Sequence, residues 1–362
     1  MSARLRTRHQ RRARGPRHQP GWRAHPLPRG LIVRSRAPIA VMACEDAIHL
    51  GRALGQGLGI ALTPSRDVWF ASGEGKHVID ANLRGTDTYI VQRCCGSDSV
   101  WSAYDRFTML LHAVDAARFA DAGRVTAVIP YLPGTRQDKR KDHVREGVST
   151  GLFARMLTAA GADMVITIEP HTEAVVGCYN PRECVLESVS VCRPFARFLR
   201  QQGWTPDCVA STDVGGLERA RQFAQVLQCD LVALSKERDY SAPSQVAKTT
   251  VVGNVQGRSV LIVDDIVDTA GSVVAAAHAL WQAGARDIAI AGVHMVLSDP
   301  AWDRLKGLAQ EASERGVDFR LGGTNTVCHR RMELPMATFD LSDLLTSVVR
   351  SVNSCGSVRA LE

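Results

Sequence analysis

The residues best suited to chemistry lie in one run, SVLIVDDIVDTAGSVVAAAHAL, at positions 259–280. An apolar strand ends in two aspartates, and a short loop with a third aspartate, two hydroxyl side chains and a glycine then opens a helix. Successive N–H groups at a helix start suit a phosphate, and carboxylates beside them accept hydrogen bonds from sugar hydroxyls. The pattern therefore predicts a sugar-phosphate site. Its residues are Asp264, Asp265, Asp268, Thr269, Ala270, Gly271 and Ser272.

A second run, VIPYLPGTRQDKRKD at 128–142, places a cationic loop directly after an apolar strand. The cations are Arg136, Lys139, Arg140 and Lys141. Cations at the end of a parallel strand favour binding of a polyphosphate, because they meet several phosphate oxygens at once.

Three further strand ends carry polar groups. His171 follows ITIEP, and a neutral imidazole there can bind a divalent cation or a phosphate. Asp213 leaves a strand just before a pair of glycines that opens a helix. Lys236 and Arg238 lead into a polar loop whose composition suits a lid that closes over a transferring phosphoryl group.

The elements that must position these residues alternate between strand and helix. Strands are expected at 38–43, 66–71, 76–80, 87–92, 126–132, 164–170, 207–212, 230–235, 249–255, 259–265 and 287–297. Helices are expected at 44–60, 101–121, 149–161, 190–202, 215–228, 271–284 and 300–315, and a short strand and helix close the chain. Such alternation predicts parallel sheets covered on both faces. The segments LTAAGADMVITIEPH and LWQAGARDIAIAGVH share one pattern: a helix end, an Ala-Gly-Ala turn, an apolar strand and a histidine. This repetition indicates two similarly built α/β domains.

Composition is that of a globular protein of about two domains, with 362 residues of which 45% are hydrophobic. No apolar run approaches a membrane span, and no apolar core follows the N-terminal charges as in a signal peptide. Aromatic residues make up 6%, which disfavours a stacking surface for single-stranded nucleic acid. We therefore expect neither a membrane nor a specific nucleic acid as a partner.

The excess of positive charge is confined to the first 36 residues, which hold 11 Arg and no acidic residue. The remaining chain has 33 basic and 37 acidic residues, so it is mildly acidic. We expect residues 1–36 to be a disordered tail, with a nucleic-acid arm or an organelle presequence as alternatives.

None of the ten cysteines belongs to a CxxC pair, so the spacing does not support a zinc ribbon or a thioredoxin-type site. Their scatter through apolar runs is typical of reduced, mostly buried thiols and favours a cytoplasmic location.

Taken in order, the motifs resemble the ribose-phosphate pyrophosphokinase family, also called phosphoribosyl pyrophosphate synthetases, over about residues 38–355. The segments that carry the resemblance are FASGEGKHVIDANLRGTDTYIVQ, VIPYLPGTRQDKR, AGAD before ITIEPH, STDVGG, SKER and LIVDDIVDTAGS. The resemblance implies two tandem phosphoribosyltransferase-like α/β domains, each a mainly parallel sheet flanked by helices. It implies that the diphosphoryl group of ATP moves to ribose 5-phosphate, with Mg²⁺, for nucleotide biosynthesis.

The domain boundaries expected from this resemblance follow the basic tail. An ATP-side domain would span 37–188 and be completed by 335–352, and a ribose-5-phosphate-side domain would span 189–334.

The resemblance also assigns roles to single residues. The ATP-binding residues would be Phe70, Glu74, Arg136, Gln137 and Asp142, the metal ligands His171 and Asp213, and the catalytic cations Lys236 and Arg238. The ribose-5-phosphate loop would be Asp264, Asp265, Asp268, Thr269, Ala270, Gly271 and Ser272. Because the family's loop matching Phe70 and Glu74 is lent by a neighbouring subunit, the resemblance implies a homo-oligomer built from dimers and up to a hexamer.

The departures from the family pattern lie on the nucleotide side, at Ser72, Glu169 and Cys184. Two alternatives to the synthetase remain, a weakly active or inactive regulatory paralogue and a type I phosphoribosyltransferase. The retained cations Lys236 and Arg238 favour an active enzyme, and the RQDKR and SKER segments favour the synthetase over the transferase.

Overall fold

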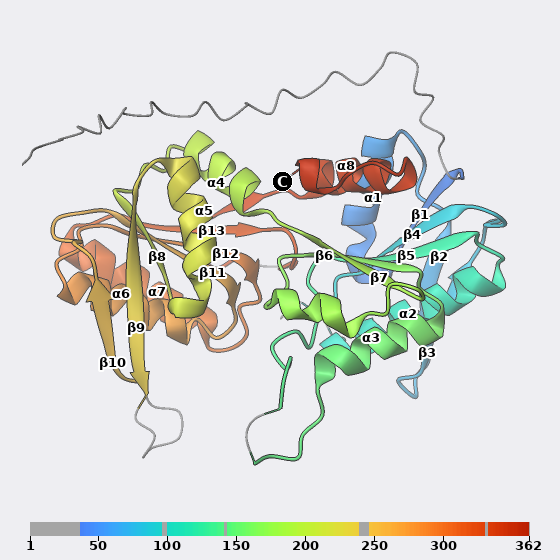
Figure 1. Ribbon diagram of the computed structural model, residues 1–362, viewed down its shortest axis with the longest axis horizontal. Helices are drawn as coiled ribbons and strands as arrows, with labels where there is room; N and C mark the ends of the chain where they lie inside the picture. Colours follow the sequence, from blue (N-terminus) through green and yellow to red (C-terminus); the bar gives the residue numbers. More distant parts are fainter. Residues whose placement is uncertain (1–36, 96–99, 141–142, 239–245, 330–331, 362) are drawn as a thin grey trace, which may run out of the picture. The chain divides into compact units, whose positions relative to one another are not determined.

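A parallel sheet in each half of the chain forms the framework of this computed structural model (Figure 1). The structure describes residues 37–95, 100–140, 143–238, 246–329 and 332–361. The first sheet has the order β1-β4-β5-β6-β7, with every neighbouring pair parallel. Its strands are β1 (Ile39–Ala43), β4 (Asp87–Val91), β5 (Arg124–Ile129), β6 (Met164–Ile168) and β7 (Val185–Val189).

Both faces of the first sheet are covered because its strands are apolar on both sides. Val41 of β1 shares one core with Leu50, whereas its neighbour Met42 shares the other with Phe107. The helical segments of this half are η1 (Glu45–Ala47), α1 (Ile48–Leu58), α2 (Ala103–Phe119), α3 (Ser149–Ala160) and η2 (Glu173–Cys178). The alternation along β1 thus sends successive side chains to α1 on one face and α2 on the other.

Strands β2 (Ser65–Trp69) and β3 (Gly75–Ile79) form a separate antiparallel hairpin between α1 and β4. The ring of Trp69 stacks on that of Trp101, with 3.8 Å between the ring centroids. This hairpin is an exception to the parallel arrangement expected from the alternation of elements.

The second sheet has the order β10-β9-β8-β11-β12-β13-β14 and is parallel except for the antiparallel pair β9–β10. Its strands are β8 (Cys208–Ser211), β9 (Asp230–Arg238), β10 (Val246–Val252), β11 (Val260–Val267), β12 (Ile288–Met295), β13 (Phe319–Thr324) and β14 (Met336–Phe339).

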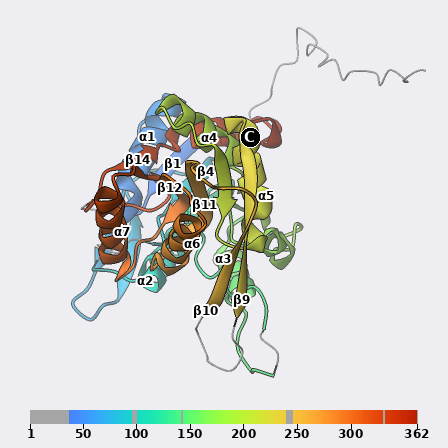
Figure 2. The ribbon, with the colours of Figure 1, turned by 90° about the vertical axis from the view of Figure 1, so that its left-hand side faces the viewer.

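Helices again cover both faces of the second sheet (Figure 2). Phe195 and Phe223 pack against Val263 on one face, and Leu280 and Leu305 pack with Ile262 on the other. The helices are α4 (Cys192–Gln201), η3 (Val214–Gly216), α5 (Leu217–Leu227), α6 (Gly271–Gln282) and α7 (Ala301–Arg315).

The end of the chain is divided between the two sheets. Within 335–352, the segment expected to complete the first domain, β14 pairs with β13 of the second sheet. The following helix α8 (Ser342–Asn353) instead packs on α1, where Leu345 shares a core with Leu54. A short helix η4 (Arg359–Leu361) follows.

The strand β7 is absent from the elements expected from sequence. Its five residues, VLESV, include the polar Glu187 and Ser188, so no apolar run marks it. It is a strand because its backbone pairs with β6, from Met164 opposite Val185 to Ile168 opposite Val189.

Within the described ranges, no helix is long and apolar enough to cross a membrane. None of the ten cysteines forms a disulfide. Burial raises the pKa of several thiols, that of Cys184 to about 11, which keeps them protonated.

Candidate active site

Strand β11 delivers the paired aspartates at its carboxyl end. Asp264 Oδ2 accepts a hydrogen bond of 2.9 Å from the Thr212 hydroxyl, and Asp264 Oδ1 accepts one of 3.0 Å from the Asp265 backbone N–H. Burial, reinforced by the neighbouring Asp265, raises the pKa of Asp264 to about 7. Asp265 is itself buried, with 6% of its surface exposed. The strand therefore places two carboxyl groups side by side, and the pKa of the first, Asp264, is raised.

The His171 side chain reaches Asp265 from the other half of the chain. His171 Nδ1 donates to Asp265 Oδ2 over 2.6 Å, and this hydrogen bond raises the pKa of His171. Burial alone would raise the pKa of Asp265, but the bond from His171 and the charge of Arg219 outweigh it and lower that pKa. Two residues predicted separately from sequence are thus direct partners.

Arg219 on α5 is a residue that the sequence analysis missed. Its guanidinium lies 3.6 Å from Asp265 Oδ1 and 4.0 Å from Glu169 Oε2, and its side chain is largely buried. It follows the Gly215-Gly216 pair at the start of a helix, and that position beside a strand end is the signal that could have indicated it. Arg219 supplies a positive charge between two buried carboxylates.

The backbone at Glu169, just after β6, has φ of 37°, a conformation that side chains rarely adopt. Three groups hold the residue there. His294 Nε2 donates to the Glu169 carbonyl oxygen over 3.1 Å, while Val191 N–H donates to Glu169 Oε1 over 3.0 Å. The Ser190 hydroxyl also donates to Glu169 Oε1. This strained turn leads directly into His171.

The loop after β11 has the backbone that an anion site needs. Ala270 adopts the left-handed conformation, with φ of 59°, and α6 begins at the next residue. Consecutive N–H groups at such a turn and helix start form a concave donor surface. Arg304, on α7, donates from Nη1 to the Thr269 carbonyl oxygen over 2.8 Å and adds a positive charge nearby. Arg304 was not expected from the sequence.

The cationic loop after β5 meets the same site. Arg136 Nη1 donates to Asp268 Oδ2 over 2.7 Å, so residues 132 positions apart are in contact. Gln137 accepts a hydrogen bond from the Ser149 hydroxyl at the start of α3. Asp142 lies outside the described residues.

Asp213 follows β8, the neighbour of β11 in the sheet. Its carboxylate is exposed and accepts a 3.1 Å hydrogen bond from the Gly216 N–H, which caps η3. A Cβ at Gly216 would lie 3.1 Å from the Ser211 Cβ, so glycine allows the close approach of this helix start to the strand. The Asp213 carboxylate is thus exposed at the same edge of the sheet as Asp264, at the carboxyl ends of two neighbouring strands.

Phe70 and Glu74 lie at the tip of the β2–β3 hairpin. Phe70 N–H donates to the Glu74 carbonyl oxygen over 2.8 Å, and the Phe70 ring is half-exposed beneath the Lys76 ammonium. Over the described ranges, no hydrogen bond or ion pair joins this hairpin to the loop at 264–272. Within one chain the structure does not bring this pair into the site.

The backbone of Lys236 and Arg238 lies at the end of β9, where it pairs with β10, whereas β8 pairs with the start of β9 at 230–232. Their side chains are outside the described part of the chain, and so is the following segment 239–245.

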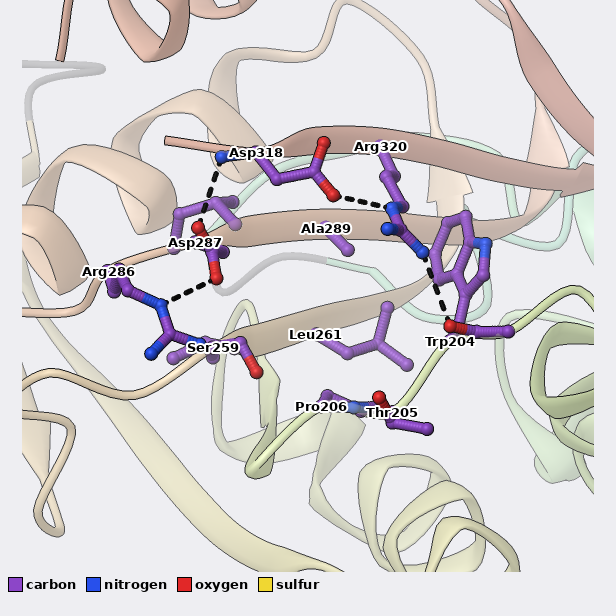
Figure 3. Close-up of a pocket in the computed structure, with 13 residues that line it drawn as sticks. Trp204, Thr205, Pro206, Ser259, Leu261, Arg286, Asp287, Ala289, Asp318 and Arg320 are labelled. Atoms are coloured by element: carbon purple, nitrogen blue, oxygen red, sulfur yellow. Dashed lines mark hydrogen bonds and ion pairs between the residues drawn. The ribbon is translucent and has the colours of Figure 1, made fainter. Parts of the chain in front are cut away.

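A separate cavity of about 160 Å³ lies at the opposite, amino-terminal ends of β11, β12 and β13 (Figure 3). Its charged groups pair with one another, Arg286 with Asp287 and Arg320 with Asp318. Ligands of open parallel α/β sheets bind beyond the carboxyl ends of the strands, so this cavity at the amino-terminal ends is not the candidate site.

We expect Arg219→Met to lower the free energy of unfolding by about 3 kcal/mol, because Glu169 and Asp265 would lose the cation between them. Equilibrium urea unfolding would measure the change. Arg221→Met is the matched control on the same helix, since Arg221 is exposed and pairs only with Glu218 in the described structure. Equal losses in the two variants would contradict this role for Arg219.

The two mainly parallel sheets, with a loop of carboxylate and hydroxyl side chains at a strand end, define the phosphoribosyltransferase type of fold. Residues 185–306 match the family model described as the phosphoribosyl transferase domain. Residues 39–161 match the model described as the N-terminal domain of ribose phosphate pyrophosphokinase. The chain belongs to the ribose-phosphate pyrophosphokinase family.

Relatives along the length of the chain support that membership. The ribose-phosphate pyrophosphokinase of Clostridium acetobutylicum is 36% identical over 69% of this chain and 75% of its own. That of Wolinella succinogenes is 31% identical over 86% of this chain and 95% of its own. The crystal structure of phosphoribosylpyrophosphate synthetase from Mycobacterium smegmatis matches with a TM-score of 0.76 and 28% identity, over 88% of this chain and 100% of that one. The fold class predicted from sequence is confirmed.

Proposed function

We propose that this protein transfers the diphosphoryl group of ATP to ribose 5-phosphate, giving 5-phosphoribosyl 1-diphosphate and AMP. The proposal rests on one observation: residues from both halves of the chain meet at the carboxyl end of β11. His171 contacts Asp265 and Arg136 contacts Asp268, so the cationic loop of one half faces the sugar-phosphate loop of the other. A donor and an acceptor substrate can therefore bind side by side.

The loop after β11 binds ribose 5-phosphate in this proposal. Asp264 and Asp265 accept hydrogen bonds from the ribose hydroxyls, and the helix start with its Thr269 and Ser272 hydroxyls donates to the phosphate. Asp268, Ala270 and Gly271 complete the loop. The left-handed turn at Ala270 supports this assignment because it directs successive N–H groups toward one place.

ATP binds on the other side. Arg136 and Gln137 contact its phosphates, with Asp142 on the same loop, and Phe70 and Glu74 receive the adenine. The anomeric hydroxyl oxygen attacks the β-phosphorus and its proton passes to solvent, while the bond from the β-phosphorus to the oxygen that bridges it to the α-phosphorus breaks and AMP leaves with that oxygen. Lys236 and Arg238 stabilise the charge that develops on the non-bridging oxygens.

The residues present fit a divalent cation, which we propose is Mg²⁺. Mg²⁺ is usually held by one or two carboxylates together with substrate phosphates and waters. The exposed Asp213 carboxylate meets that requirement, and His171 is half-exposed beside the phosphate loop. These two residues would hold the ion, which when bound would neutralise phosphate charge.

A homo-oligomer would account for the position of Phe70 and Glu74, because among the described residues their hairpin makes no hydrogen bond or ion pair with the loop at 264–272. We propose that a neighbouring copy supplies this hairpin, in an assembly built from dimers. The ten cysteines without a disulfide support a cytoplasmic location.

The test is release of AMP by the purified chain supplied with ATP, Mg²⁺ and ribose 5-phosphate. We expect AMP and phosphoribosyl diphosphate in equal amounts, and no AMP when ribose 5-phosphate is omitted. Calorimetric binding of ribose 5-phosphate without AMP release would overturn the proposal in favour of a regulatory paralogue. Consumption of phosphoribosyl diphosphate with a nucleobase would instead indicate a transferase.

A further inference from the structure

A second cluster of metal-ligating side chains lies outside the candidate active site, where the end of β1 meets the β2–β3 hairpin. Cys44, Asp67 and His77 each offer a donor atom, and the sulfur, the carboxylate oxygen and the ring nitrogen all lie within 4.8 Å of one another. In the described part of the chain, no other group of three or more such side chains gathers this closely.

This cluster is closed to solvent. Cys44 and the His77 side chain are fully buried, and the Asp67 side chain is 4% exposed. Asp67 and His77 are opposite each other in the register of the hairpin, and His77 Nδ1 donates to Asp67 Oδ1 over 2.7 Å. The Glu45 N–H donates to Asp67 Oδ2 over 2.8 Å, which ties the hairpin to the residue after Cys44.

One buried atom in the cluster has no hydrogen-bond partner. Across the residues that the structure describes, nothing pairs with His77 Nε2, although it is shielded from water. Because Nε2 lies on the side of the imidazole ring away from Nδ1 and Asp67, an ion shared with the Asp67 carboxylate would have to bind Nδ1.

We propose that Cys44, Asp67 and His77 bind one Zn²⁺ ion. The donors are a sulfur, an imidazole nitrogen and a carboxylate oxygen, which suit zinc, whereas Mg²⁺ prefers oxygen alone. Zinc would take the place of the proton on His77 Nδ1, the ring nitrogen that lies 2.7 Å from Asp67 Oδ1. Asp67 Oδ1, released from its hydrogen bond with His77, would then ligate the same ion, while Asp67 Oδ2 keeps its hydrogen bond from the Glu45 N–H.

The spacing of the donors fits this assignment. Donor atoms around a tetrahedral zinc ion lie about 3–4 Å apart, given bonds of about 2.0–2.3 Å, so small side-chain rotations close the site.

The ion would have a structural role. Cys44 follows β1, Asp67 lies in β2 and His77 lies in β3, so one ion joins the first sheet to both strands of the hairpin. Sequence spacing could not indicate this site, because its ligands come from three segments and form no CxxC or HxxxH pattern.

The test measures metal rather than catalysis, so its outcome is independent of the proposed activity. The full chain is stripped with a chelator, equilibrated with Zn²⁺ and dialysed, and zinc is counted by mass spectrometry. We expect one bound zinc per chain, lost in Cys44→Ser and in His77→Gln. Cys208→Ser, which alters a buried thiol of the second sheet, is the control and should retain the ion.

Two further readouts protect the test against variants that fold poorly. Co²⁺ in the wild-type chain should give a thiolate charge-transfer absorption, which an ion held by the oxygen and nitrogen ligands of the active site would lack. Zinc at about 100 times its Kd should raise the Tm of the wild type by about 5 °C. A wild type that retains no zinc, or retains it with no thiolate absorption from Co²⁺, would overturn the proposal.

Discussion

Replacement of Lys236 by alanine is expected to lower kcat by about 10²–10³-fold, because the loss of one preorganised charge aimed at a transition state typically has that effect. Charge builds on the non-bridging oxygens of the β-phosphate only as the bond to the new acceptor forms. A cation that acts on that charge contributes little to ground-state binding. The KM values for ATP and ribose 5-phosphate should therefore stay within a few-fold of the wild type.

Steady-state kinetics with each substrate varied in turn would measure this effect. Lys306→Ala is the matched control, because Lys306 lies on α7 and pairs at the surface with Glu333 and Asp303. A variant at 236 with raised KM and normal kcat would show that this lysine binds substrate uniformly, which contradicts a role in the transition state.

Asp265→Ala should weaken ribose 5-phosphate binding by about 10- to 100-fold for each hydrogen bond lost, since bonds to charged groups contribute about 1.5–3 kcal/mol. The effect should be large because Asp265 also organises its surroundings. It accepts from His171 Nδ1 and faces Arg219, so its removal leaves both without the carboxylate that orients them.

Isothermal calorimetry with ribose 5-phosphate would measure the loss, with circular dichroism to show that the fold survives. Asp287→Ala is the control, because Asp287 lies at the amino-terminal end of β12 in the cavity whose charges pair among themselves (Figure 3). Unchanged affinity in the variant at 265 would mean that the strand-end aspartates do not bind the sugar.

Contiguous patterns explain why the strand–loop–helix arrangement at 259–280 could be predicted from sequence. The strand, the loop at 268–272 and the start of α6 follow one another directly, so their mutual placement depends on local backbone preferences. The same holds for the cationic loop after β5. The antiparallel hairpins β2–β3 and β9–β10 were not anticipated, because strand direction depends on which neighbours pair and not on apolar periodicity.

Contiguous sequence patterns do not indicate contacts that form only when helices and strands pack together, as the contacts of Arg219, Glu169 and Arg304 show. Arg219 is one of many arginines on helices, and only the packing of α5 beside β11 places it between two carboxylates. The turn at Glu169 is held by His294 and by the residues after β7, none of which is adjacent in sequence.

The sequence by itself determined the alternation of elements, the two-domain α/β class and the strand, loop and helix start at 259–280, because these depend on neighbouring residues and short periodicities. The tertiary structure alone decided that His171 meets Asp265, that Arg136 meets Asp268 and that three distant segments bring Cys44, Asp67 and His77 together. These contacts join residues up to 132 positions apart, and they form only when the sheets pack and bury the apolar surface between them.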